Sequence, residues 1–171
     1  MSSSFDLGSV DRLTVGTVGP AGQRVFYLQA TSGTQVVSLK LEKTQVAALV
    51  TYLATLLSDL PAPDTLPTEM DLVEPLVAEW VIGALGVSYL EDRDRILVQA
   101  EEMVEDDSLE SDDSDGATAR FFATREQVAG LAARGAEVVA AGRPPCQLCG
   151  QPLDPEGHVC VRLNGHRSQS R

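Results

Sequence analysis

The three cysteines of this chain all lie in one short stretch near its C-terminal end, "CQLCGQPLDPEGHVC", which runs from Cys146 to Cys160. One of the two histidines, His158, lies in the same stretch. Thiolates and an imidazole are the usual ligands of a tetrahedral zinc ion. Cys146 and Cys149 have the Cys-x2-Cys spacing of a zinc knuckle. The Gly150 that follows permits the tight turn that aims both thiolates at one ion.

The fourth ligand of this site could be either histidine. With Cys160 as the third thiolate, His158 gives the pattern Cys-x2-Cys-x8-His-x-Cys, and His166 gives Cys-x2-Cys-x10-Cys-x5-His. Three cysteines are an odd number, which argues against a disulfide framework. A segment as polar as "GQPLDPEGH" also has little reason to fold without a metal. We therefore expect residues 143–171 to form a zinc-knuckle tail that holds a structural Zn²⁺.

The composition of the chain is that of a globular protein. Its 171 residues, of which 43% are hydrophobic, suffice for one compact domain or for a domain built from two similar halves. No apolar run is long enough to span a bilayer, and "MSSSFDLGSVDR" does not resemble a secretory signal. We therefore expect a cytoplasmic protein with no membrane partner. Thiols stay reduced in that compartment, so clustered cysteines favour metal binding over disulfides.

The net charge of −12 is concentrated in two segments. Nine acidic residues lie between Glu101 and Asp115, and six more lie between Asp59 and Glu79, without a Lys or Arg in either segment. Such a surface repels nucleic acid and phospholipid. The tail differs, because it carries four arginines against two acidic residues, and it could still contact nucleic acid through Arg143, Arg162, Arg167 and Arg171.

Two parts of the sequence resemble each other. "QRVFYLQA" at Gln23–Ala30 aligns with "DRILVQAE" at Asp94–Glu101 with a shift of 71 residues. "QVAAL" at Gln45–Leu49 aligns with "QVAGL" at Gln127–Leu131 with a shift of 82 residues. An acidic insert at 101–116 accounts for the difference between the two shifts. This order of matches indicates an internal repeat.

The fold class that follows is α+β. We expect a duplicated domain over residues 1–142, with two β-β-β-α halves at about 5–57 and 80–142 and a Pro-rich linker at 58–79. The halves would share one antiparallel sheet of about six strands, with the helices on one face. The segments with strand patterns are 10–18, 25–30, 34–43, 79–90, 95–102 and 117–123. The segments with helical patterns are Gln45–Leu57 and the stretch from the N-cap Thr124 to Gly142.

Nothing in the sequence has the pattern of a catalytic site. There is no Gly-x-Ser-x-Gly motif, and both histidines lie in the tail. A zinc ion with three Cys and one His ligand has no open position for water. We therefore expect a non-catalytic interaction or scaffold module with a protein partner. The alternatives are a nucleic-acid-binding protein that uses the basic zinc tail, and an enzyme with a site between the two halves.

Three segments carry a resemblance to a known family. "AGRPPCQLCGQPLDPEGHVCVRLNGHR", "GPAGQRVFYLQA" and "LEKTQVAAL" resemble a family of uncharacterised actinobacterial proteins that share a domain of unknown function. The resemblance covers nearly the whole chain, and its most specific part is C-x2-C-x2-P-x-D-P-x-G-H-x-C. It implies that His158, rather than His166, is the fourth ligand. Many members have Pro where this chain has Val161, which leaves the ligands unchanged. The resemblance implies no activity.

Overall fold

A computed structural model describes most of the body of the chain and part of its tail. The described residues are 2–105, 116–142, 145–151, 153, 158, 160 and 162. Most of the acidic insert predicted at 101–116 lies outside them, as does His166.

The described residues form seven strands and two α-helices. In chain order they are β1 (Phe5–Leu7), β2 (Arg12–Val18), β3 (Val25–Ser32), β4 (Gln35–Leu41), α1 (Lys43–Ser58), β5 (Ala78–Leu90), β6 (Arg95–Glu102), β7 (Thr118–Ala123) and α2 (Arg125–Ala140). The α+β class is confirmed, and three strands followed by a helix occur twice, as β2-β3-β4-α1 and β5-β6-β7-α2. The sequence pattern does not predict β1.

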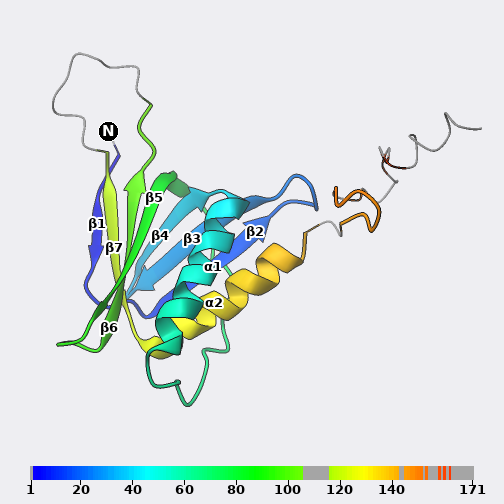
Figure 1. Cartoon of the computed structure of the whole chain (residues 1–171). Helices are drawn as coiled ribbons and strands as arrows, with labels where there is room; N and C mark the ends of the chain where they lie inside the picture. Colours follow the sequence, from blue (N-terminus) through cyan, green and yellow to red (C-terminus); the bar gives the residue numbers. More distant parts are fainter. Residues whose placement is uncertain are drawn as a thin grey trace, which may run out of the picture.

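All seven strands belong to one sheet, in the order β1-β7-β6-β5-β4-β3-β2 (Figure 1). The sheet is mixed, whereas the sequence predicted antiparallel pairing throughout: β4 pairs with β5 in parallel, and so does β1 with β7. The reason at β4–β5 is the connection between them. Parallel neighbours need a long crossover, which α1 and the linker provide, while the antiparallel pairs β2–β3, β3–β4 and β5–β6 follow tight turns.

The junction between the two halves of the sheet is short. β4 and β5 are in register only at Ser38 with Ala78 and at Lys40 with Val81. β4 ends at Leu41, but β5 continues to Leu90 and pairs there with β6 alone. Within the described part of the chain, the second half of β5 therefore has one edge without a partner strand.

The hydrophobic core lies between the sheet and the two helices, which cover the same face (Figure 1). Helical spacing buries Val46 and Leu53 on α1, and Leu131 on α2. The helices approach closely at Gly135, where an added Cβ would lie 2.5 Å from Cγ2 of Val50. The core side chains of the sheet include Leu28, Leu39, Ile82, Ile96, Val98 and Phe121, all fully buried.

The predicted cap of the second helix is confirmed. The Thr124 hydroxyl accepts a hydrogen bond from the backbone N–H of Gln127, and the Gln127 side chain accepts one from the backbone N–H of Thr124. These two bonds satisfy backbone groups that the first turn of a helix leaves unpaired. The helix ends at Ala140, and its C-cap is Ala141, one residue before the predicted Gly142.

The linker between α1 and β5 contains neither helix nor strand, as the sequence predicts, yet it packs against the sheet. Two polar side chains of the strands, Thr14 and Gln29, are fully buried or nearly so. Thr14 donates to the carbonyl of Met70. Gln29 donates to the carbonyl of Val73 at 2.9 Å and accepts from its backbone N–H at 2.8 Å. The linker thus supplies the partners that these buried groups require.

None of the helices in the described residues combines the length and the apolar character that crossing a membrane requires.

Candidate metal centre

The first two cysteines of the tail lie on a tight turn. The backbone N–H of Gly150 donates to the carbonyl of Cys146 at 2.8 Å, and the backbone N–H of Cys146 donates to the carbonyl of Gln151 at 2.8 Å. Gly150 has a φ of +75°, in the left-handed region that side chains with a Cβ rarely adopt. This turn brings Cys149 back toward Cys146, as the Cys-x2-Cys-Gly pattern predicts.

The four predicted ligands come together in space. The ligand atoms of Cys146, Cys149, His158 and Cys160 all lie within 4.8 Å of one another. The Sγ atoms of Cys146 and Cys160 are 4.0 Å apart, and Sγ of Cys149 is 3.4 Å from Nε2 of His158. Tetrahedral zinc with ordinary bond lengths places two sulfur ligands about 3.8 Å apart, and sulfur and nitrogen about 3.5 Å apart. The cluster is therefore arranged as a possible metal site.

The thiols of this cluster are not joined to one another. All three cysteines are free, and 4.0 Å between Cys146 and Cys160 is about twice the length of a disulfide bond. Cys160 is 4% exposed and Cys146 is 9% exposed, while Cys149 and His158 are partly buried. The cluster thus has two sheltered sulfur atoms and a more open side at Cys149 and His158.

Backbone amides affect the pKa values of two thiols in the cluster. The backbone N–H groups of Cys149 and Leu148 point at the Cys146 sulfur and lower the pKa of this thiol. The pKa of Cys149 is raised: an N–H from Gln151 lowers it, but burial and the neighbouring thiols outweigh that effect. Amides that stabilise a thiolate at Cys146 favour the form that binds metals.

Two basic residues of the body lie where the tail leaves it, an arrangement that our sequence analysis did not predict. Arg24 donates to the carbonyl of Val138 in the last turn of α2 at 2.9 Å. A Cβ added to Gly142 would lie 2.7 Å from Nζ of Lys43 and 3.0 Å from Nη2 of Arg24. Cations stabilise the negative end of a helix dipole, and α2 has no basic residue in its own last turn. The only available signal was that absence of a basic residue.

Of the other residues considered from the sequence, Arg162 is described by the structure, whereas His166, Arg143, Arg167 and Arg171 lie outside the described residues.

Comparisons with known proteins agree with the extent of the resemblance found in the sequence. A family model described as "Protein of unknown function (DUF3090)" matches residues 5–160. The match ends at Cys160, so it contains all four residues of the cluster and does not reach His166. No curated protein and no solved structure matches the chain.

Proposed function

The chain belongs to the DUF3090 family, whose description states no activity, and we propose that it is a zinc protein with a non-catalytic interaction role. In this proposal Cys146, Cys149, His158 and Cys160 bind one structural Zn²⁺. The folded tail then serves as a surface for a protein partner. The observation that carries the proposal is the convergence of four ligand atoms within 4.8 Å of one another.

The donor set favours zinc over other metals. Three thiolates and one imidazole are soft or borderline ligands, which suit zinc and do not suit magnesium or calcium. Iron–sulfur clusters are usually held by four cysteines, and this chain has three. The spacing between the ligand atoms is also close to that of a tetrahedral site.

A structural role follows from the number of ligands and from the surroundings. Four protein ligands fill a tetrahedral shell and leave no position for a reactive water. The described part of the tail also has little apolar burial of its own, since its buried residues are Cys146 and Cys160 and its Leu148 is 51% exposed. Metal binding then supplies the folding free energy that a hydrophobic core supplies elsewhere.

An interaction role is supported by Leu148. Its side chain lies on the turn between two metal ligands and is 51% exposed. A turn that is held by a metal keeps such a side chain in a fixed place. Binding a partner then costs the turn little further conformational entropy. The acidic segments of the body repel nucleic acid, which favours a protein as the partner although the tail itself is mildly basic.

The metal half of this proposal is tested by native mass spectrometry of protein purified without chelator. We expect one zinc per chain. His158→Ala should lose the zinc, and the matched change His166→Ala in the same tail should retain it. A wild-type protein that takes up no zinc when it is offered would refute the site. Loss of zinc only in His166→Ala would refute the ligand assignment.

The interaction half is tested by a photo-crosslinking residue placed at position 148 in living cells. We expect a protein adduct from this position and none from the same residue at Ala54, which is also exposed but lies on α1. Adducts with nucleic acid, or equal adducts from both positions, would contradict a protein-binding tail.

A further inference from the structure

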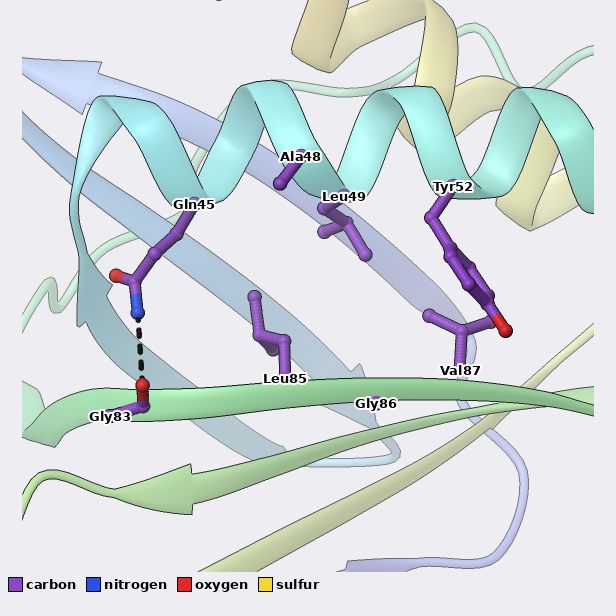
Figure 2. A pocket seen from close by; sticks show the side chains of 8 residues that line it. All are labelled: Gln45, Ala48, Leu49, Tyr52, Gly83, Leu85, Gly86 and Val87. Atoms are coloured by element: carbon purple, nitrogen blue, oxygen red, sulfur yellow. Dashed lines mark hydrogen bonds between the residues drawn. The ribbon is translucent and has the colours of Figure 1, made fainter.

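A groove runs between helix α1 and the second half of strand β5, far from the tail in sequence (Figure 2). Two adjoining cavities, of about 450 and 370 Å³, lie along it and share Tyr52. Apolar and small side chains line the larger cavity, among them Ala48 and Leu49 from α1 and Leu85 and Val87 from β5.

The groove exposes apolar surface. Tyr52 is 56% exposed, Ala48 is exposed, and Leu85 and Val87 are only partly buried. Covering such surface is favourable by about 25 cal/mol per Å² of apolar area. A contiguous apolar groove of this kind marks a binding site more often than ordinary surface.

The groove also follows the backbone of the strand. Leu85 and Val87 point toward α1, and Gly86 between them lines the same cavity through its backbone, because it has no side chain. The edge of β5 along this stretch is the one that β4 leaves unpaired after Val81.

Only the beginning of this edge is occupied. The Gln45 side chain donates to the carbonyl of Ile82 at 3.1 Å. It also donates, more weakly, to the carbonyl of Gly83 at 3.4 Å (Figure 2). Among the described residues, no other group bonds to the β5 backbone on that side. Unpaired strand edges bind extended peptides by adding them to the sheet as a further strand.

Charge distinguishes the two ends of the groove. No charged residue lines the larger cavity, whereas Asp59 lines the smaller one. Asp59 is also the C-cap of α1, whose last turn contains no basic residue. The carboxylate and the negative end of the helix dipole therefore act together at this end. A ligand that carries a Lys or Arg side chain complements it.

We propose that this groove binds an extended peptide segment of a partner protein, which adds as a strand to the edge of β5 between Gly83 and Leu90. At about 3.4 Å per residue, that edge takes roughly eight residues. Apolar side chains of the peptide pack against Ala48 and Leu49, and a basic side chain lies near Asp59. This site is separate from the metal centre and extends the proposed function to the body of the protein.

The probe for this site is a phage-displayed library of random dodecapeptides, selected on the full-length wild-type protein. We expect peptides with alternating apolar residues and a terminal Lys or Arg. Ala48→Glu places a carboxylate in the groove and should weaken the binding of these peptides by about tenfold or more. The carboxylate would lose its water when a peptide binds and would gain no hydrogen-bond or ionic partner. The matched control is Ala54→Glu, also exposed on α1 but outside both cavities, which should bind as the wild type does.

Two further measurements separate strand addition from simple apolar contact. Methylation of alternate backbone amides of a selected peptide should abolish its binding. Amide hydrogen exchange should slow in Gly83–Leu90 when the unmodified peptide binds. Asp59→Asn should weaken binding most at low salt.

The inference is wrong if no peptide is enriched, if the enriched peptides bind Ala48→Glu and wild type equally, or if the methylated peptides bind as tightly as the unmodified ones. Binding should persist in Cys149→Ser, so failure of the groove and failure of the metal centre give different results.

Discussion

The body and the tail of this protein are stabilised in different ways. In the body, side chains such as Leu53, Ile96 and Phe121 are fully buried in one core that joins both helices to the sheet. In the described part of the tail, the buried residues are Cys146 and Cys160, which belong to the possible metal site. If the proposed zinc site exists, the body is stabilised by its core and the tail by the metal. Variants in each region should reveal how independent the two are.

Metal removal should have the largest effect. A chelator, or Cys149→Ser, removes a contribution that reaches about 10–16 kcal/mol in zinc-finger peptides at neutral pH. We expect the amides of residues 146–151 to lose their protection from hydrogen exchange while the strands and helices keep theirs. The unfolding temperature of the body should change by less than about 3 °C. A large fall in that temperature would show that the two regions are coupled.

Phe121→Ala is the reciprocal change in the body. Removing a fully buried aromatic ring should cost about 3–5 kcal/mol in the free energy of unfolding, as measured with a denaturant. The folded variant should still bind one zinc. Tyr52→Ala removes an aromatic ring that is 56% exposed and should cost far less. Zinc loss from folded Phe121→Ala would contradict the independence of the tail.

Thr124→Ala tests α2, the helix that leads toward the tail. Loss of the hydroxyl that accepts from the Gln127 N–H should cost about 1 kcal/mol of unfolding free energy. Thr124→Ser keeps a hydroxyl and should restore most of the stability. Zinc affinity should be the same in all three proteins. If it falls with Thr124→Ala alone, the helix transmits its stability to the metal centre.

The smallest effect concerns pH and the exposed β5–β6 turn. The Tyr89 hydroxyl donates to Asp94 at 2.9 Å, and Arg125 pairs with the same carboxylate at 3.1 Å. The Tyr89 bond, followed by Arg125, lowers the pKa of Asp94 below its ordinary value. A carboxyl group whose pKa is lower in the folded protein stabilises the fold at pH values above its ordinary pKa. This stabilisation is lost as the pH falls through the lowered pKa.

Tyr89→Phe should therefore raise the pKa of Asp94 toward its ordinary value, as a carboxyl NMR titration would show. Because the pair is exposed to solvent, overall stability should hardly change. An unchanged pKa would mean that Arg125, and not Tyr89, keeps the pKa of Asp94 low.

The helices and hairpins could be predicted because their signals are local. The helix predicted over Gln45–Leu57 is α1, two residues longer at its start and one at its end. The strand predicted over 95–102 is β6. A possible metal site in the tail was likewise predictable, because the identity and spacing of cysteines restrict the chemistry. The choice of His158 over His166 rested on the family resemblance and stays a prediction.

Features that depend on distant partners could not be predicted in this way. β1 has three residues, which are too few to show the alternating pattern of a strand. It forms a strand because it pairs with β7. Thr14 and Gln29 are polar residues of two strands, and nothing in the local sequence shows that the linker buries them. The groove arises because β4 ends at Leu41 while β5 continues, and strand lengths in a finished sheet are a tertiary property.

The parallel pairing of β1 with β7 also has a consequence for how the chain is made. Phe5 lies 114 residues before Ala119, its neighbour in the sheet. At about 5–20 residues per second, the ribosome takes roughly 6–23 s to synthesise the chain between them. During this time β1 has no partner strand, while β2, β3 and β4 can already form hairpins. Strand β1 therefore joins the sheet only after the second half of the fold has been made.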